Sequence, residues 1–317
     1  QRVTLDNGTT LSYDSLVLAT GIEFDDIPGH DPAVIPHAWI AGDSTEQLRQ
    51  QLNSELSPGG TVVMTIPKAP YRCPPGPYER ACLLAAMARK ITDDAGGAGV
   101  HGSPTVVVLD ANSGIQAEKA TFTAAFTGLY GDVIQYVPNA QLNSVDPANR
   151  SVETTVGSYA GDVLNVIPNH RAPALLRDAG LTDGGPWAPV DPVTYETRAP
   201  GLSDIYVIGD AQATSQPKSA HMANAQAKVC ADALIRKASG LSAHEPERLA
   251  NITTNSACFS PVSFSEAAWL TAVFRYNQAL GAMELAPNSL GASDGWDRES
   301  YRDMYTWASN LFSDTFV

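Results

Sequence analysis

One strand–turn–helix pattern constrains the fold of this chain more than any other stretch. Residues 61–66 form an apolar run that predicts a buried strand, and residues 81–90 predict a helix. The turn between them reads Tyr-Arg-Cys-Pro-Pro-Gly-Pro-Tyr-Glu, over residues 71–79. A nucleotide-binding turn at this place is rich in glycine, because its N–H groups approach a pyrophosphate. Proline has no N–H to donate, so the turn predicts a rigidly held Cys73 rather than a phosphate site.

A second strand completes the unit. Residues 104–110 are apolar up to Asp110, and the right-handed crossover rule makes this strand parallel to 61–66. Asp110 ends its strand where a ribose-binding carboxylate is expected. We therefore interpret residues 42–170 as an NAD-like domain without the nucleotide fingerprint, with further strands at 133–137, 152–156 and 163–168 and helices at 46–56 and 121–130.

Two other strands end in turns of small residues. Residues 14–21 close on Ala-Thr-Gly, and residues 205–211 close on Gly-Asp-Ala. Taken alone, the second turn is better read as an ordinary strand end with a helix-capping Asp. Together, with a βαβ insert between them, the two turns are typical of the FAD domain of disulfide-reductase-like flavoproteins. The fold expected is α/β, with two Rossmann-like domains (FAD/NAD(P)-type) with parallel sheets: an FAD domain from 1–41 and 171–244, the NAD-like domain, and a C-terminal α+β interface domain at 245–317.

Composition excludes several classes of function. The net charge of −14 argues against nucleic acid, because phosphate-binding surfaces need clustered Lys and Arg. No apolar run approaches the roughly 20 residues that span a bilayer. The four cysteines include no CxxC or Cys/His cluster, so no metal site is expected. Cys82 and Cys230 lie in alanine-rich helical segments and are expected to be buried and inert.

The sequence resembles the flavoprotein subunit of flavocytochrome c sulfide dehydrogenase. The resemblance is carried by residues 71–79, by Asp-Val-Leu-Asn-Val-Ile-Pro at 162–168, by Val-Ile-Gly-Asp-Ala at 207–211, by Pro-Lys-Ser at 217–219 and by Ser-Ala-Cys-Phe-Ser around Cys258. The family's first βαβ unit, with its Gly-x-Gly-x-x-Gly turn for FAD, has no counterpart in the sequence given. We expect that segment to have been removed or to be a separate polypeptide.

The resemblance implies a site. It places a redox disulfide between Cys73 and Cys258 beside the flavin, and a Trp296 that lines the substrate-facing side. Glu79 is either a proton acceptor for the substrate or an ordinary first-turn helix carboxylate, the second reading being slightly favoured. The residues expected to contact FAD are Thr20, Gly21, Gly209, Asp210, Ala211, Lys218, Ser219 and Trp296. His101, His170 and His221 have no triad-like neighbours in the sequence and are assigned no catalytic role.

The same resemblance implies a function. Hydrosulfide would be oxidised to sulfur or polysulfide, with FAD as the cofactor. Any covalent attachment of the FAD would be through the missing segment. The haem c would be carried by a cytochrome subunit, which forms a heterodimer with this chain. The redox disulfide and the c-type cytochrome imply a periplasmic location. The alternatives are a quinone-linked sulfide oxidoreductase, a pyridine-nucleotide disulfide reductase and a non-catalytic truncated paralogue that binds a cytochrome.

Overall fold

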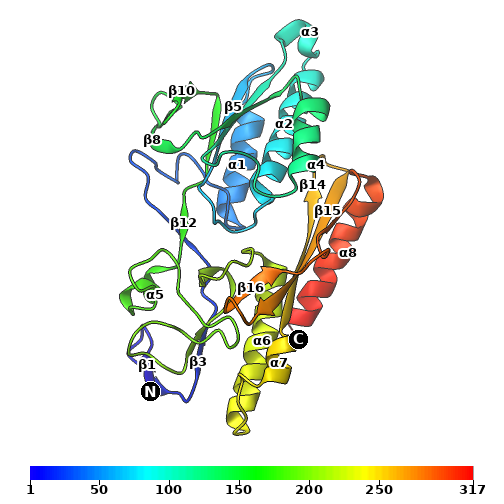
Figure 1. The fold of residues 1–317 in the computed structure, drawn as a ribbon. Helices are drawn as coiled ribbons and strands as arrows, with labels where there is room; N and C mark the ends of the chain where they lie inside the picture. The colour runs from blue at the N-terminus through cyan, green and yellow to red at the C-terminus, as the bar shows by residue number, and fades with distance from the viewer. Residues whose placement is uncertain (317) are drawn as a thin grey trace. The chain divides into compact units, whose positions relative to one another are not determined.

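The computed structural model describes residues 1–316 and has a mixed α/β fold with parallel sheets, as predicted (Figure 1). The chain divides into two compact units. Unit 1 comprises residues 1–23, 171–257 and 271–291, and unit 2 comprises residues 24–170, 258–270 and 292–316. No helix within residues 1–316 is long and apolar enough to cross a membrane.

Unit 2 is built on a four-stranded parallel sheet in the order β11-β5-β6-β7. The strands are β5 (Thr61–Ile66), β6 (Thr105–Asp110), β7 (Ile134–Pro138) and β11 (Val163–Val166). Helix α2 (Gly76–Asp94) connects β5 to β6, which confirms the predicted βαβ unit. Consecutive strand residues point to opposite faces, and both faces are buried. For this reason the strands read as continuous apolar runs.

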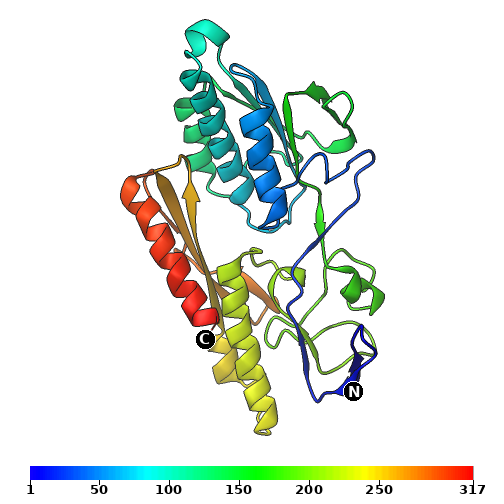
Figure 2. The same cartoon turned by 180° about the vertical axis from the view of Figure 1, so that it is seen from behind.

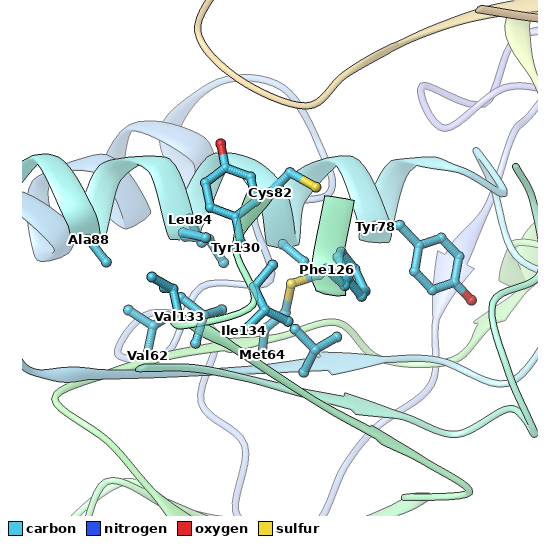
Figure 3. Packing of buried hydrophobic residues seen from close by; sticks show 14 of the residues in the cluster. Val62, Met64, Tyr78, Cys82, Leu84, Ala88, Phe126, Tyr130, Val133 and Ile134 are labelled. Atoms are coloured by element: carbon cyan, nitrogen blue, oxygen red, sulfur yellow. The ribbon is translucent and has the colours of Figure 1, made fainter. Parts of the chain in front are cut away.

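Helices cover one face of this sheet. Val62 and Met64 of β5 pack there against Cys82 and Leu84 of α2, in one apolar cluster (Figure 3). Helix α1 (Asp43–Ser54) lies beside α2 on the same face, and both are plain in the view from behind (Figure 2). The predicted helix at 121–130 is divided into α4 (Lys119–Ala124) and a π-helical turn, Ala125–Leu129.

The other face of the sheet packs against a small antiparallel meander. Its strands are β8 (Leu142–Asp146), β9 (Ser151–Thr154) and β10 (Gly157–Ala160). Val145 and Val152 from the meander join Val63 and Val107 in a second apolar cluster. The strand predicted at 152–156 extends too far, because the chain turns back at residues 155–156 and β10 begins at Gly157, opposite Thr154. Unit 2 also contains the short helix α3 (Ala98–His101).

Unit 1 brings the beginning of the chain together with the segment after residue 170. A hairpin of β1 (Arg2–Thr4) and β2 (Thr10–Ser12) precedes β3 (Leu16–Leu18), which pairs in parallel with β13 (Ile205–Val207). The core includes Cys230 and the aromatic side chains of Trp187, Tyr195 and Tyr206. The helices are α5 (Ala174–Asp178), α6 (Ala220–Ala238) and α7 (Pro246–Asn251), and a 3-10 turn covers Gly209–Ala211.

The C-terminal segment contributes to both units. Its elements are β14 (Thr253–Pro261), β15 (Ala267–Asn277), β16 (Ala282–Leu285), β17 (Gly291–Ala292) and α8 (Arg298–Thr315), and the short strands β4 (Glu23–Phe24) and β12 (His170–Arg171) lie where the chain passes between units. Residues 245–317 were predicted to form one interface domain, whereas parts of this segment belong to each of the two compact units. The functional domain boundaries stay a prediction.

Candidate active site

The proline-rich turn holds Cys73 at the start of α2. Cys73 has a φ of +60°, an uncommon conformation for a non-glycine residue. Its carbonyl accepts a hydrogen bond from the N–H of Gly76 at 2.9 Å. A Cβ atom at Gly76 would lie 2.8 Å from the Cys73 sulfur and 3.0 Å from the Trp39 ring. Glycine is needed at this position because the sulfur and the indole occupy the space of a side chain.

The burial of Cys73 and the negative charges around it favour the neutral thiol. Burial raises the pKa of Cys73 well above its usual value, and the charges of Glu79 and Cys258 raise it further. The N–H of Gly76 and the charge of Arg72 act in the opposite direction. Cys258, on β14, therefore lies close enough to Cys73 for the charge of one to affect the other. All four cysteines are thiols in this structure, so the disulfide stays a prediction.

Glu79 shares a buried serine with a second carboxyl that the sequence analysis missed. The Oγ atom of Ser260 lies 3.0 Å from Oε1 of Glu79 and 2.6 Å from Oε1 of Glu118. Ser260 is fully buried, with an exposed fraction of 0%. Burial raises the pKa of Glu79 to about 8, and the charge of Glu118 also raises it. Glu79 is thus more than an exposed first-turn carboxylate, although the structure does not test its catalytic role.

Two arginines frame the turn on the side of Trp39. The guanidinium of Arg72 donates to the Trp39 carbonyl, and its backbone N–H donates to Nδ1 of His170 at 2.9 Å. The guanidinium of Arg80 donates to the Ala38 carbonyl at 2.6 Å and lies 5.5 Å from the centre of the Trp39 ring. Trp39 was not identified from the sequence, because it lies in a proline-rich connection with no motif around it. Trp296 packs against the same apolar cluster.

Asp110 does not present a carboxylate to a ribose. Its Oδ2 accepts hydrogen bonds from the hydroxyls of Tyr78 and Tyr136 at 2.9 and 2.7 Å. Its Oδ1 accepts from the backbone and side chain of Asn112, both at 2.8 Å. Tyr78 comes from the proline-rich turn itself. The turn therefore supplies the ring and hydroxyl of Tyr78 where the nucleotide-binding domains have glycine. Both oxygens of the buried Asp110 carboxylate are used in hydrogen bonds within the protein.

The two turns of small residues meet in unit 1. β3 and β13 pair in parallel, with Leu18 opposite Val207, and the N–H of Ile208 donates to the Leu18 carbonyl at 3.1 Å. The residues that follow, Thr20-Gly21 and Gly209-Asp210-Ala211, therefore leave the same edge of this sheet. Gly21 and Gly209 have φ values of +69° and +74°, which glycine adopts without strain.

Buried polar atoms at this edge fit a bound cofactor. Thr20 Oγ1 and Gln212 Nε2 are buried and have no hydrogen-bond partner among the described residues. Such atoms are costly unless a ligand or water satisfies them. A Cβ atom at Gly21 would meet nothing within 4 Å, so there is open space beside the turn. These features suit the hydroxyl and phosphate chain of FAD, and Gln212 was not among the residues predicted.

Lys218 and Ser219 are both tied to the protein. Lys218 is 4% exposed, and its Nζ donates to the carbonyls of Asp210 and Gln212, each at 2.7 Å. The same ammonium lies 3.7 Å from the centre of the Trp187 ring. Burial lowers the pKa of Lys218 to about 8. Ser219 caps α6, accepting from the Met222 N–H at 3.2 Å. Lys218 thus holds the 209–212 turn in shape. Contact of Lys218 and Ser219 with a flavin stays a prediction.

The cysteine and flavin candidates thus fall into two sets. Unit 2 holds Cys73, Cys258, Glu79 and Trp296, and unit 1 holds the remaining residues predicted to contact FAD. Within residues 1–316, no group of three or more His, Cys, Asp or Glu side chains could hold a metal ion.

Solved structures with this fold are known. The sulfide:quinone oxidoreductase of the hyperthermophilic bacterium Aquifex aeolicus matches with a TM-score of 0.68 and 13% identity, over 98% of this chain and 70% of that one. A chain of the Tetrahymena thermophila mitochondrial ATP synthase matches with a TM-score of 0.62 and 18% identity, over 86% of this chain and 66% of that one. The NAD-dependent persulfide reductase of A. fulgidus matches with a TM-score of 0.53 and 15% identity, over 86% of this chain and 46% of that one. These likenesses show the fold: two Rossmann-like domains.

A family model narrows the class. Residues 45–168 match the family described as sulfide dehydrogenase (flavocytochrome c) flavoprotein chain, central. The match confirms the predicted resemblance over these residues, which include the proline-rich turn, Cys73, Glu79 and Glu118. Residues 45–168 therefore resemble the central part of that flavoprotein chain.

Proposed function

We propose that this chain is the flavoprotein part of a periplasmic sulfide dehydrogenase. It oxidises hydrosulfide through a Cys73–Cys258 disulfide and passes the electrons to a c-type cytochrome subunit. The observation that carries the proposal is the placement of Cys73. Its sulfur lies at the start of a helix, fixed by the turn, with Cys258 and Glu79 near enough to influence its pKa. The family match over residues 45–168 supports the same reading.

The chemistry begins with the disulfide form of the pair. Hydrosulfide attacks one sulfur, the S–S bond breaks, and the products are a cysteine persulfide and a thiolate. A second hydrosulfide then attacks the outer sulfur of the persulfide. This attack releases the cysteine that carried the persulfide, and the product is hydrogen disulfide. Each turnover thus leaves two reduced cysteines. Re-forming the disulfide requires removal of two electrons, which is the chemistry that FAD supplies when bound.

The chain's own residues have three tasks in this scheme. The turn at 73–76 holds one sulfur still, and Gly76 leaves the room that the sulfur needs. Arg72 and the N–H of Gly76 partly offset the burial that raises the pKa of Cys73, and so help its sulfur to leave as a thiolate. Glu79 accepts a proton when hydrogen sulfide, rather than hydrosulfide, enters the site.

A cytochrome is preferred to a quinone as the electron acceptor. A helix that binds an anionic membrane surface is rich in Lys or Arg. Helix α8 has two arginines against three acidic residues, so it has no excess of positive charge. It also exposes the aromatic side chains of Tyr305 and Phe312. Exposed aromatic residues suit a protein partner better. A non-catalytic, flavin-free paralogue is the remaining alternative.

Absorption spectroscopy tests the proposal. The purified protein should show the visible absorption of oxidised flavin, and sulfide should bleach it. Cys258→Ser should abolish bleaching, while Cys230→Ala, a change in the core of unit 1, should keep it. Stopped-flow mixing with a c-type cytochrome or with a soluble quinone identifies the acceptor. No flavin, or full bleaching in Cys258→Ser, would reject the mechanism.

A further inference from the structure

We propose that Glu79 and Glu118 act as one proton-sharing pair joined by Ser260, in which Glu118 sets the pH at which Glu79 takes up a proton. The inference rests on the proposed function for its meaning in catalysis. Glu118 is a positioning residue in this scheme, since it acts on the substrate only through Glu79. The pair itself is argued from the contacts of three side chains.

The hydrogen-bond count requires a shared proton. A serine hydroxyl carries one proton and donates to one acceptor at a time. Ser260 Oγ nevertheless lies within hydrogen-bond distance of both Glu79 Oε1, at 3.0 Å, and Glu118 Oε1, at 2.6 Å. Both contacts are satisfied when one carboxyl is protonated and donates to Ser260, which then donates to the other. The fully ionised pair lacks that second donor.

The position of Glu118 supports the same conclusion. Its φ of +48° lies in the left-handed region, which a glutamate adopts only at a cost of about 1 kcal/mol or more. Its second carboxyl oxygen, Oε2, is buried without a hydrogen-bond partner among the described residues. An ionised carboxylate would leave that oxygen poorly solvated. Burial also raises the pKa of Glu118.

Within residues 1–316, no ion pair joins a cation to either carboxyl. Arg80 lowers the pKa of Glu79, but its guanidinium is bound to Asn165 Oδ1, at 3.1 Å, and to the Ala38 carbonyl. The other titratable groups that feel the charge of Glu79 are the thiols of Cys73 and Cys82, whose pKa values it raises. The thiol of Cys258 lies near Cys73 on the same strand as Ser260. The pair therefore keeps one proton until the solution is alkaline.

The pair gives the reaction a base of suitable strength. When both carboxyls are ionised the pair carries two negative charges, and it accepts one proton from hydrogen sulfide, which leaves as hydrosulfide. Atoms and charge balance, because the pair keeps one negative charge as the substrate becomes an anion. A carboxylate with an ordinary pKa would be far too weak a base for this step near neutral pH.

Infrared titration of the whole protein, labelled with ¹³C-glutamate, tests the pair without sulfide. The wild type should keep the carbonyl band of a protonated glutamic acid at neutral pH and lose it with a midpoint near the Glu79 pKa of about 8. Glu118→Gln removes a charge that raises this pKa, so the midpoint should fall by about 1 pH unit or more. Ser260→Ala removes a donor that lowers it, so the midpoint should rise.

Controls separate the pair from a structural role. Glu299→Gln, at an exposed helix start, should leave the band and its midpoint unchanged. If Glu118→Gln fails to fold, Glu118→Asn removes the same charge and suits the left-handed backbone. An unchanged midpoint in a folded Glu118 variant overturns the pair. The titration needs no turnover, so a protein that does not oxidise sulfide would refute the proposed function and leave this result standing.

Discussion

The sulfur of Cys73 lies in the space beside Gly76 that a side chain would fill, and it leaves room for a hydrogen atom but not for a methyl group. A Cβ atom there would lie 2.8 Å from Cys73 Sγ. The first residue of α2 and the candidate redox cysteine therefore fit closely together. The Trp39 ring borders the same space, 3.0 Å from where that Cβ atom would lie.

Gly76→Ala should displace the Cys73 sulfur or the Trp39 ring. Overpacking of this kind costs about 1–3 kcal/mol of unfolding free energy. Chemical denaturation measures the loss, and the rate of iodoacetamide labelling of Cys73, followed by peptide mass spectrometry, should change with it. Gly128→Ala is the matched control, because a Cβ atom there meets nothing within 4 Å. Equal stability of the two variants would show that the space at Gly76 is not restrictive.

Stability should fall as the pH rises through the range in which Glu79 titrates. The folded pKa of Glu79, about 8, lies above the ordinary value of 4.5, so the folded state binds the proton more tightly than the unfolded state. The stabilisation is fully present below pH 4.5 and is lost as pH rises toward 8. The slope reaches about 1.4 kcal/mol per pH unit for one proton.

Urea denaturation at several pH values measures this slope. Glu79→Gln, which stays neutral, should flatten the decline between mildly acidic and mildly alkaline pH. The exposed-site variant Glu299→Gln should keep it. A wild-type protein that grows more stable over this range would mean that Glu79 is ionised in the folded state.

Lys218→Met should loosen the turn at 209–212. Methionine fills a similar volume but donates nothing to the carbonyls of Asp210 and Gln212, which would then be left without this buried donor. A loss of about 2–3 kcal/mol is expected for a charged hydrogen-bonding group. Thermal unfolding should show it, together with weaker retention of flavin on gel filtration. Lys90→Met, which removes only an exposed i,i+4 ion pair with Asp94, should cost less than about 0.5 kcal/mol.

Much of unit 2 could be predicted from local patterns. The strands β5 and β6 and the helix between them follow from apolar runs and a turn, all within about 50 residues. The burial of Cys82 and Cys230 followed from their alanine-rich helices and is confirmed. The predicted end of one strand was wrong: the strand expected through residue 156 ends at Thr154, and a hairpin turn follows at residues 155–156.

The candidate site was only partly predictable. Glu118 and Ser260 carry no motif, and the bond between them joins residues 142 positions apart. Glu79 and Ser260 are separated by 181 positions. The proximity of Cys73 and Cys258 was expected only because of a family resemblance. Nothing in the spacing of residues along a chain reports such contacts.

The sequence by itself determined the parallel βαβ unit, because the periodicity of the hydrophobic residues and the choice of turn residues act between positions close together along the chain. It also determined that the turn offers a sulfur and no row of N–H groups, since three prolines exclude a phosphate cradle at 71–79. Only the tertiary structure decided the electrostatic environment of that sulfur. A pKa depends on burial and on charges within a few ångströms, and the packing of β14 against α2 brings Ser260 to Glu79.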